Sequence, residues 1–268
     1  MTNPIDKVFA DRKALKLMTH VVAGYPDLET TETLIRMMAD SGADLVEMQI
    51  PFSDPLADGP TIATANQAAL DNGITPGHCF RLAEKLKRSV DIPLLIMTYA
   101  NIPFSMGIEQ FVKRCSESGI SGMIVPDLPF DQSPWYLEAA EKYGCSPILV
   151  VSPGMSSERL TDIVQKARGF IYTTLRVGIT GARRTIHESG LDFLETLRTC
   201  TSLPIAAGFG ISSAEMVNQL QGRADAAVIG SHIIEILNHQ GIDAVGQFIR
   251  SCKKEGNREG TRRAANRF

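Results

Sequence analysis

The sequence lacks several features that define common classes of protein. Its 268 residues include only five cysteines, which are far apart and never form a C-x-x-C pair, so a disulfide framework or zinc site is not expected. No apolar run approaches the ~20 residues of a membrane span, and the N-terminus has no apolar signal segment. The net charge of -3 gives no electrostatic reason to expect nucleic acid or membrane as a partner. We therefore predict a cytoplasmic protein with reduced thiols.

Motifs of several large enzyme classes are also missing. The chain has no G-x-S-x-G nucleophile motif, no Walker phosphate loop and no G-x-G-x-x-G at its first helix. Its five histidines show no metal-ligand spacing, and no cluster of carboxylates indicates a divalent ion. The residues therefore predict no metal site.

Short apolar runs alternate with helix-period segments along the whole chain. Strands that are joined by helices must run parallel, so the pattern predicts an α/β fold with one helix after each strand. Eight such units in about 250 residues match the (β/α)8 TIM barrel. A doubly wound open sheet is the alternative, but it usually has fewer strands and does not close. The predicted strands lie within residues 15–22, 44–50, 93–99, 122–127, 147–153, 169–175, 203–210 and 226–231.

One domain accounts for nearly the whole chain. We assign residues 1–252 to the barrel, including a short N-terminal amphipathic helix with Ile5, Val8 and Phe9 on one side. Residues 253–268 are basic and contain few large apolar side chains, so we predict a flexible surface tail. A nucleic-acid-binding arm is the less favoured alternative for so short a run.

The stretch EMQIPFSDPLADGP, residues 47–60, places acids at the end of an apolar strand. In a parallel barrel the functional groups lie at the C-terminal ends of the strands. Side chains alternate along a strand, so Glu47 lies opposite the apolar Val46 and Met48 and is predicted to point into the barrel mouth. Asp58 follows in the loop, and two acids at one pocket could divide proton donation and acceptance. The alternatives are a structural glutamate paired with a base and an aspartate that only shapes the turn.

Two glycine-rich turns follow the last two predicted strands: AGFGISS at 207–213 and IGSHI at 229–233. Glycine bares backbone amides, and a helix start after it makes an anion site. The loops after strands seven and eight are the common phosphate site of such barrels. We therefore predict a phosphate site there, with ordinary strand–helix turns as the alternative.

The long loop LRVGITGARRT, residues 175–185, follows the sixth predicted strand. Two glycines allow hinging, and Thr180 can hydrogen-bond a substrate or a catalytic acid. We predict a lid over the mouth that excludes water, with a plain surface loop as the alternative.

Five motifs in order along the chain resemble the α-subunit family of tryptophan synthase: PFSDPLADGPTI, MTYANIPFSMGIEQF, VPDLP, GITGAR and GFGIS. The similarity covers nearly the whole chain, and the first motif is highly specific. The resemblance implies a lyase of tryptophan biosynthesis that cleaves indole-3-glycerol phosphate by a retro-aldol reaction. Its products would be indole and glyceraldehyde 3-phosphate.

The resemblance also implies roles for individual residues. Glu47 and Asp58 would be catalytic: Glu47 would carry protons between the side-chain hydroxyl and the ring carbon, and Asp58 would stabilise positive charge at the indole nitrogen. The substrate-binding residues would be Tyr172, Thr180, Gly181, Phe209, Gly210, Gly230 and Ser231.

A partner follows from the resemblance as well. The family forms an α2β2 complex with a β subunit that depends on pyridoxal phosphate (PLP) and receives indole through a tunnel. PLP is therefore expected in the partner and no cofactor in this chain. Asp54, Tyr99 and Asn101 resemble residues of the docking surface.

The chain departs from the family pattern near the predicted mouth. Gln49 stands where glycine is usual, His20 where an aromatic residue is frequent and Leu175 where serine is common; Val22 and Tyr25 also differ. We expect each change to touch the mouth and to alter rate or substrate detail but not the fold. The alternatives to an active lyase are a weakly or non-catalytic subunit that gates its partner, and a barrel for another sugar phosphate.

Overall fold

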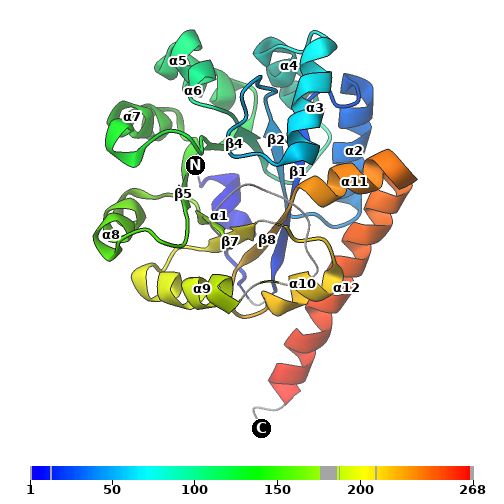
Figure 1. The fold of residues 1–268 in the computed structure, drawn as a ribbon, viewed down its shortest axis with the longest axis vertical. Coiled ribbons are helices and arrows are strands. Elements are labelled where there is room, and N and C mark those ends of the chain that lie inside the picture. The colour runs from blue at the N-terminus through cyan, green and yellow to red at the C-terminus, as the bar shows by residue number, and fades with distance from the viewer. Residues whose placement is uncertain (1, 13, 176–185, 187, 209, 266–268) are drawn as a thin grey trace.

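Eight parallel strands close into a barrel, with helices arranged around it (Figure 1). The computed structural model describes residues 2–12, 14–175, 186, 188–208 and 210–265. Each strand pairs with its neighbour in sequence, and β8 pairs with β1. This closure confirms the TIM barrel and rules out the open sheet. The strands are β1 (Lys16–Val22), β2 (Leu45–Gln49), β3 (Leu94–Met97), β4 (Ile120–Ile124), β5 (Ser146–Val151), β6 (Ile171–Thr174), β7 (Ile205–Gly208) and β8 (Ala226–Ile229).

Helices return the chain between strands, and two of them were not predicted. The additional helices are α3, which starts at Pro60 where proline is favoured, and the short α5. A 3-10 turn spans Phe130–Gln132. The α-helices are α1 (Pro4–Val8), α2 (Leu28–Asp40), α3 (Pro60–Asp71), α4 (Pro76–Leu86), α5 (Asn101–Met106), α6 (Ile108–Glu117), α7 (Pro134–Tyr143), α8 (Ser157–Lys166), α9 (Glu188–Cys200), α10 (Ala214–Gln219), α11 (Ser231–Gln240) and α12 (Ile242–Ala265).

Strand β2 shows how the sequence separates the two layers of the core. All five of its residues are buried. Leu45 packs with Met18 and Leu95 inside the barrel, whereas Val46 and Met48 belong to the larger cluster between strands and helices. The predicted alternation is therefore confirmed, and it places Glu47 on the inner face with Leu45.

Helix α1 closes the N-terminal end of the barrel. Asn3 caps it by accepting a 2.9 Å hydrogen bond from the Ile5 amide, and Ile5 is fully buried. The ring of Phe9 lies 5.6 Å from that of Phe170, which directly precedes β6. Burying side chains of this size stabilises the fold by roughly 1.5–3 kcal/mol each. The predicted amphipathic helix is thus confirmed, and the opposite end of the barrel remains for a site.

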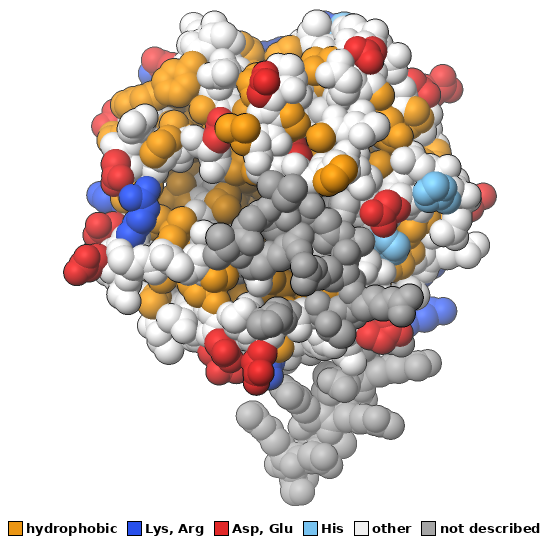
Figure 2. Space-filling view, viewed as in Figure 1, with side chains coloured by type: hydrophobic (Ala, Val, Ile, Leu, Met, Phe, Trp, Pro, Cys, Tyr) orange, Lys and Arg blue, Asp and Glu red, His pale blue; other side chains and the backbone are white. Residues whose placement is uncertain are grey.

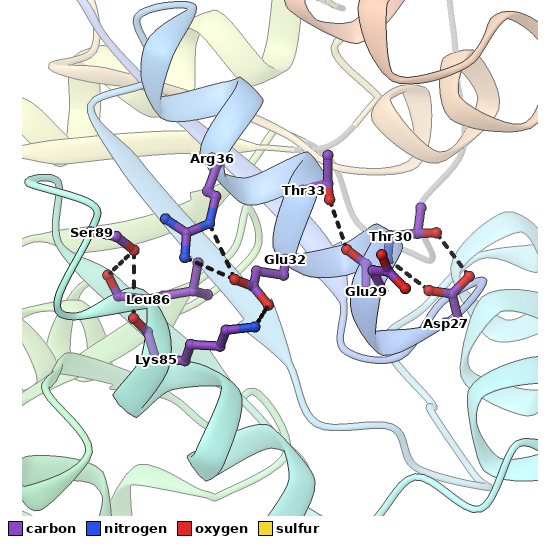
Figure 3. A network of polar contacts seen from close by, with 9 residues as sticks. All are labelled: Asp27, Glu29, Thr30, Glu32, Thr33, Arg36, Lys85, Leu86 and Ser89. Carbon is purple, nitrogen blue, oxygen red and sulfur yellow. Dashed lines mark hydrogen bonds and ion pairs between the residues drawn. The ribbon is translucent and has the colours of Figure 1, made fainter.

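A polar network joins α2 to α4 on the outer layer (Figure 3). Glu32 accepts hydrogen bonds from Lys85 at 2.6 Å and from Arg36 at 2.8 Å. These two bonds lower the pKa of Glu32. At the start of α2, Asp27 accepts a 2.7 Å bond from the Thr30 amide. The network orients neighbouring helices, although such surface pairs stabilise only by about 0–1 kcal/mol each.

The segment that was predicted as a flexible tail belongs to a long helix. Helix α12 continues through Ala265 and extends beyond the barrel in Figure 1. Buried Val245 and Ile249 hold its first turns against the barrel, and Lys253 pairs with Asp44 at 2.5 Å. A helix that is already nucleated propagates at little further cost, which explains why polar sequence follows in helical form. None of the helices within the described residues is long and apolar enough to cross a membrane.

Candidate active site

A cavity of ≈ 290 Å³ opens at the C-terminal ends of the strands. Much of its wall is apolar, with Met97, Ile124 and Val150 among the lining side chains. Figure 2 shows hydrophobic side chains gathered around a hollow on one face of the molecule. Apolar walls with a few polar groups suit a small aromatic ligand. Six residues that were predicted as site residues line this one cavity: Glu47, Asp58, Tyr172, Gly210, Gly230 and Ser231.

Glu47 lies on β2 and faces His20 of the adjacent strand β1. The two residues are paired in the strand register, so their side chains share the inner face. His20 Nδ1 lies 3.4 Å from Glu47 Oε2, and both residues are buried. Burial lowers the pKa of His20, but the charge and hydrogen bond of Glu47, together with smaller effects of Asp58 and Gln49, outweigh burial and raise the pKa above its ordinary value. Glu47 therefore lines the cavity, as predicted for a catalytic acid. It also pairs with a basic residue, as the structural alternative predicted.

Asp58 is held in place by amide side chains. Gln49 Nε2 donates to Asp58 Oδ2 at 2.7 Å, and Asn66 Nδ2 donates to the same oxygen at 3.5 Å. Burial raises the pKa of Asp58, while the bond from Gln49 and the charge of His20 oppose that rise without cancelling it. The carboxyl group is thus fixed in direction and is more readily protonated than an exposed aspartate.

Asn66, on the unpredicted helix α3, organises the loop that carries Asp58. It is fully buried, and its Oδ1 accepts hydrogen bonds from Gln49 Nε2 at 3.3 Å and from the Phe52 amide at 3.0 Å. Sequence reasoning missed this residue because the proline-rich stretch looked like a loop only. Gly59 followed by Pro60 was the available signal, since proline is favoured at the first helical position.

The glycine-rich turns after β7 and β8 form one edge of the cavity. Gly210 has a φ of +78°, a left-handed conformation that glycine adopts without strain. Gly230 follows β8, and Ser231 is the first residue of α11. A helix start presents free backbone N–H groups and the positive end of the helix dipole. This edge of the cavity therefore suits an anion such as a phosphate group.

Tyr172 of β6 forms part of the wall. Its hydroxyl packs so closely on Gly208 that a Cβ at that glycine would lie 2.9 Å from the oxygen. Burial, followed by the charges of Glu47 and Asp58, raises the pKa of Tyr172 well above its usual value. The phenol therefore stays protonated and is able to donate a hydrogen bond to a ligand.

Three of the predicted site residues lie outside the described residues. These are Thr180 and Gly181 of the predicted lid, and Phe209 between β7 and Gly210. Within the described part of the chain, no group of three or more His, Cys, Asp or Glu residues is arranged to hold a metal ion.

Of the family departures, only His20 lines the cavity itself. Gln49 lies behind the cavity wall and bonds to Asp58. Leu175 and Val22 are buried in the layer between strands and helices, and Tyr25 donates to Asn238 at 2.9 Å. The expectation that every departure touches the mouth was wrong: strand alternation turns Leu175 away from it, and Val22, although two residues from His20 on β1, packs in the outer cluster at the end of that strand.

The three residues predicted to dock a partner have different surroundings. Asp54 and Asn101 are exposed, but Tyr99 is fully buried. The Tyr99 ring stacks on Phe52 at 5.3 Å, and its hydroxyl oxygen accepts a 3.1 Å bond from the Ala57 amide. Tyr99 continues the inward alternation of β3, so its side chain supports the loop before Asp58 and offers no surface to a partner. The prediction for Tyr99 is corrected accordingly.

The fold and the cavity together define a class: a (β/α)8 barrel whose cavity is lined by two carboxyl groups and by the glycine-rich turns after β7 and β8. Sequence comparison then gives the family. The family model described as tryptophan synthase alpha chain matches residues 7–261, and the chain belongs to this family. It is accordingly a lyase of tryptophan biosynthesis, of the kind that cleaves indole-3-glycerol phosphate.

Individual relatives agree with this assignment. The tryptophan synthase alpha chain of Syntrophotalea carbinolica is 45% identical, with 90% of this chain and 96% of the relative covered. That of Desulforapulum autotrophicum is 44% identical, with 90% and 95% covered. Among solved structures, tryptophan synthase of Mycobacterium tuberculosis superposes with a TM-score of 0.87 at 28% identity, covering 94% of this chain and 96% of that one. A tryptophan synthase complex from Pyrococcus furiosus gives a TM-score of 0.82 at 28% identity, covering 89% and 98%.

Proposed function

We propose that the chain cleaves indole-3-glycerol phosphate with Glu47 and Asp58 as its catalytic groups. One observation carries the proposal: both carboxyl groups line the same apolar cavity as the glycine turns after β7 and β8. The apolar wall suits the indole ring, and the helix start at Ser231 suits the phosphate. Both ends of the substrate thus have matching surfaces within one cavity.

Glu47 moves the proton in this reaction. Its carboxylate accepts the proton of the hydroxyl on the carbon bonded to the ring. Glu47 passes this proton to the ring carbon, and positive charge develops at the ring nitrogen. The bond between the two carbons then breaks: the hydroxyl carbon becomes the aldehyde of glyceraldehyde 3-phosphate, and the electron pair of the broken bond returns to the ring, which neutralises the nitrogen and completes indole. One proton leaves oxygen and one reaches carbon, so the step consumes no external acid, base or cofactor.

Asp58 acts on the ring nitrogen, where positive charge develops as the ring carbon is protonated. Gln49 and Asn66 hold its carboxyl oxygen in a fixed direction, so no reorganisation is needed when that charge appears. Tyr172, on the opposite side of the barrel, would contact the ring or its side chain. Two placed carboxyl groups supply the acid–base chemistry that the reaction requires.

The phosphate anchors the substrate away from the reacting carbon. We assign the phosphate to the backbone amides at Gly210, Gly230 and Ser231, and we propose that Gly181 and Phe209 complete this site. Thr180, in the predicted lid, would order the catalytic acids. Binding energy at this remote handle holds the reacting bond against Glu47.

The chain is also proposed to dock a PLP-dependent β subunit in an α2β2 assembly, with PLP held by that partner. Exposed Asp54 and Asn101 lie beside apolar side chains that solvent would not favour: Leu56 is 79% exposed, and Phe104 and Trp135 form an aromatic pair with ring centroids 5.2 Å apart. Apolar surface with a polar rim is typical of a protein interface. The solved relatives include a tryptophan synthase complex. We place the assembly in the cytoplasm.

The test is indole release from indole-3-glycerol phosphate by the purified chain, with and without a β subunit. We expect slow turnover alone, faster turnover with the partner and near-complete loss in Glu47→Gln. Glu32→Gln, on the outer layer, is the matched control and should behave as wild type. Activation of the β subunit without any indole release would instead support the gating subunit that the sequence left as an alternative.

A further inference from the structure

His20 and Glu47 form a buried pair inside the barrel, and the proposed mechanism gives His20 no role. They are register partners on β1 and β2, with His20 Nδ1 3.4 Å from Glu47 Oε2. His20 is 5% exposed and Glu47 3%, and both line the cavity. Because the pair is shielded from water, its mutual attraction is screened far less than that of a surface pair.

Gln49 makes the corresponding contact to the other acid. Its Nε2 donates to Asp58 Oδ2 at 2.7 Å, so the direction of the amide is set and its Oε1 points elsewhere. Gln49 Oε1 is buried and has no hydrogen-bond partner among the described residues, and the same holds for His20 Nε2. Buried polar atoms seldom stay unpaired. These two are complementary, since a protonated imidazole nitrogen donates and an amide oxygen accepts.

We propose that His20 is a positioning residue that, as an imidazolium, bridges Glu47 to the Gln49–Asp58 pair and keeps the Glu47 carboxyl group correctly directed for proton transfer. The chain of contacts runs from Glu47 through His20 and Gln49 to Asp58, and it links the two carboxyl groups across the floor of the cavity. The inference rests on the catalytic role proposed for Glu47.

The charges around His20 support its protonated form. Among the described residues, the ionisable groups that face it are Glu47 on β2, Asp58 in the loop after β2, and Tyr172 on β6, whose hydroxyl stays neutral. Burial lowers the pKa of His20, while Glu47, then Asp58, and the side chain of Gln49 raise it, and the net shift is upward. The imidazolium therefore persists to higher pH than that of an ordinary histidine.

Two consequences follow for the reaction. The His20 imidazolium holds the Glu47 carboxyl group in the direction from which it accepts the hydroxyl proton. Loss of the His20 proton at high pH removes the charge that holds the carboxyl group, so activity should fall on the alkaline side. A phenylalanine at position 20 provides neither effect, although the aromatic residue that is frequent there in the family indicates that it fits the barrel.

The activity test is the pH profile of kcat/KM for indole-3-glycerol phosphate, measured on the complex with a β subunit. In His20→Phe we expect kcat to fall about tenfold at neutral pH, KM to change little, and the alkaline limb that follows the His20 proton to be lost. His20→Gln restores a hydrogen-bond donor without charge, so it should regain part of kcat but still lack that alkaline limb. His239→Gln, at an exposed site on α11, is the matched control. A His20→Phe profile that superimposes on wild type overturns the proposal.

A second test needs no activity. Histidine ¹⁵N NMR should show His20 titrating above 6.5 in the wild-type chain, with its signal assigned by its absence from His20→Phe. In Glu47→Gln the midpoint should fall below 6.5, because burial remains while the main attractive charge is gone. Gln49→Met should lower it by a smaller amount. An unchanged midpoint in Glu47→Gln refutes the pair itself.

The outcomes separate this inference from the proposed function. If wild type releases indole and Glu47→Gln does not, but His20→Phe keeps the wild-type pH profile, only the role of His20 fails. If Glu47→Gln retains activity, the catalytic assignment fails whatever the histidine titration shows.

Discussion

The two ends of the barrel treat buried polar groups in opposite ways. At the closed end, Asn3 satisfies the start of α1 and donates to Ser121 O at 2.9 Å, while Ile5 and Phe9 fill the interior. At the open end, buried carboxyl, imidazole and amide groups face a cavity. Of the five buried side-chain atoms without a partner in the described residues, four lie in or directly after β1, β2 and β3: Thr19 Oγ1, His20 Nε2, Gln49 Oε1 and Thr98 Oγ1.

This contrast indicates that the closed end of the barrel contributes mainly to stability, whereas the open end carries the groups proposed for catalysis. Complete packing at the closed end stabilises the strands that meet there. The unpaired polar atoms near the open end destabilise the fold slightly, and one of them, His20 Nε2, belongs to a residue that lines the cavity, where a ligand or a proton can use it. Substitutions at the two ends should therefore separate unfolding free energy from catalytic rate.

The largest effect should come from Ser231→Asp at the open end. A carboxylate at the first residue of α11 would repel the substrate phosphate, so we expect kcat/KM to fall about 10²–10³-fold. Stability should hold or rise, because a negative charge favours a helix N-terminus. Steady-state kinetics with thermal unfolding checks both parts. An unchanged KM would contradict the assignment of the phosphate site to this edge of the cavity.

Ile5→Ala should reverse that pattern at the closed end. Removing this buried side chain should lower the unfolding free energy by about 2–4 kcal/mol, since it leaves a cavity beside Gly122 and Leu95. The folded fraction should keep its kcat/KM. Urea unfolding measures the loss, and Lys7→Ala on the exposed side of α1 is the control. A tenfold fall in the kcat of folded protein would show that the two ends are coupled.

Asp58→Asn should lower the catalytic rate and raise the stability of the fold at pH 7. We expect kcat to fall about 10–100-fold, because the charge opposite the ring nitrogen is lost. The pKa of Asp58 is raised in the folded chain, so its ionisation opposes folding: that penalty is absent below the unfolded pKa and grows as pH rises towards the folded value. The variant should therefore be more stable than wild type at pH 7 and equal to it near pH 3. Unfolding curves at both pH values test this sign.

Tyr172→Phe should give the smallest effect. The ring still fills the wall beside Gly208, and only the hydroxyl is removed. We expect kcat/KM to change by about tenfold or less, with the unfolding midpoint close to wild type. A loss comparable to that of Asp58→Asn would assign the phenol a direct part in proton transfer.

Much of the fold followed from the sequence because its signals are local. Apolar runs separated by helix-period segments indicated eight strands, and alternation within β2 placed Glu47 inside the barrel before any coordinates. The glycine turns after β7 and β8 likewise marked one edge of the cavity. These features depend on neighbours within a few residues, which a sequence shows directly.

Other features depended on contacts between distant segments. Asn66 joins Gln49, Phe52 and Asp58 only once α3 packs back onto the loop. The bridge from His20 to Glu47 requires β1 and β2 to lie in one particular register. Tyr99 was assigned to the docking surface from the family resemblance alone, although the inward alternation of β3 was available as a signal. Strand register and packing across the barrel depend on several distant segments, so no single stretch of sequence predicts them.

The most direct test of the central claim is single-turnover cleavage of indole-3-glycerol phosphate by Glu47→Gln with enzyme in excess. That measurement separates substrate binding from the chemical step. If the acid on β2 moves the proton, Kd should stay within a few-fold of wild type while the cleavage rate falls about 10²–10⁴-fold. Cleavage within tenfold of wild type would contradict the account and return Glu47 to a structural role beside His20.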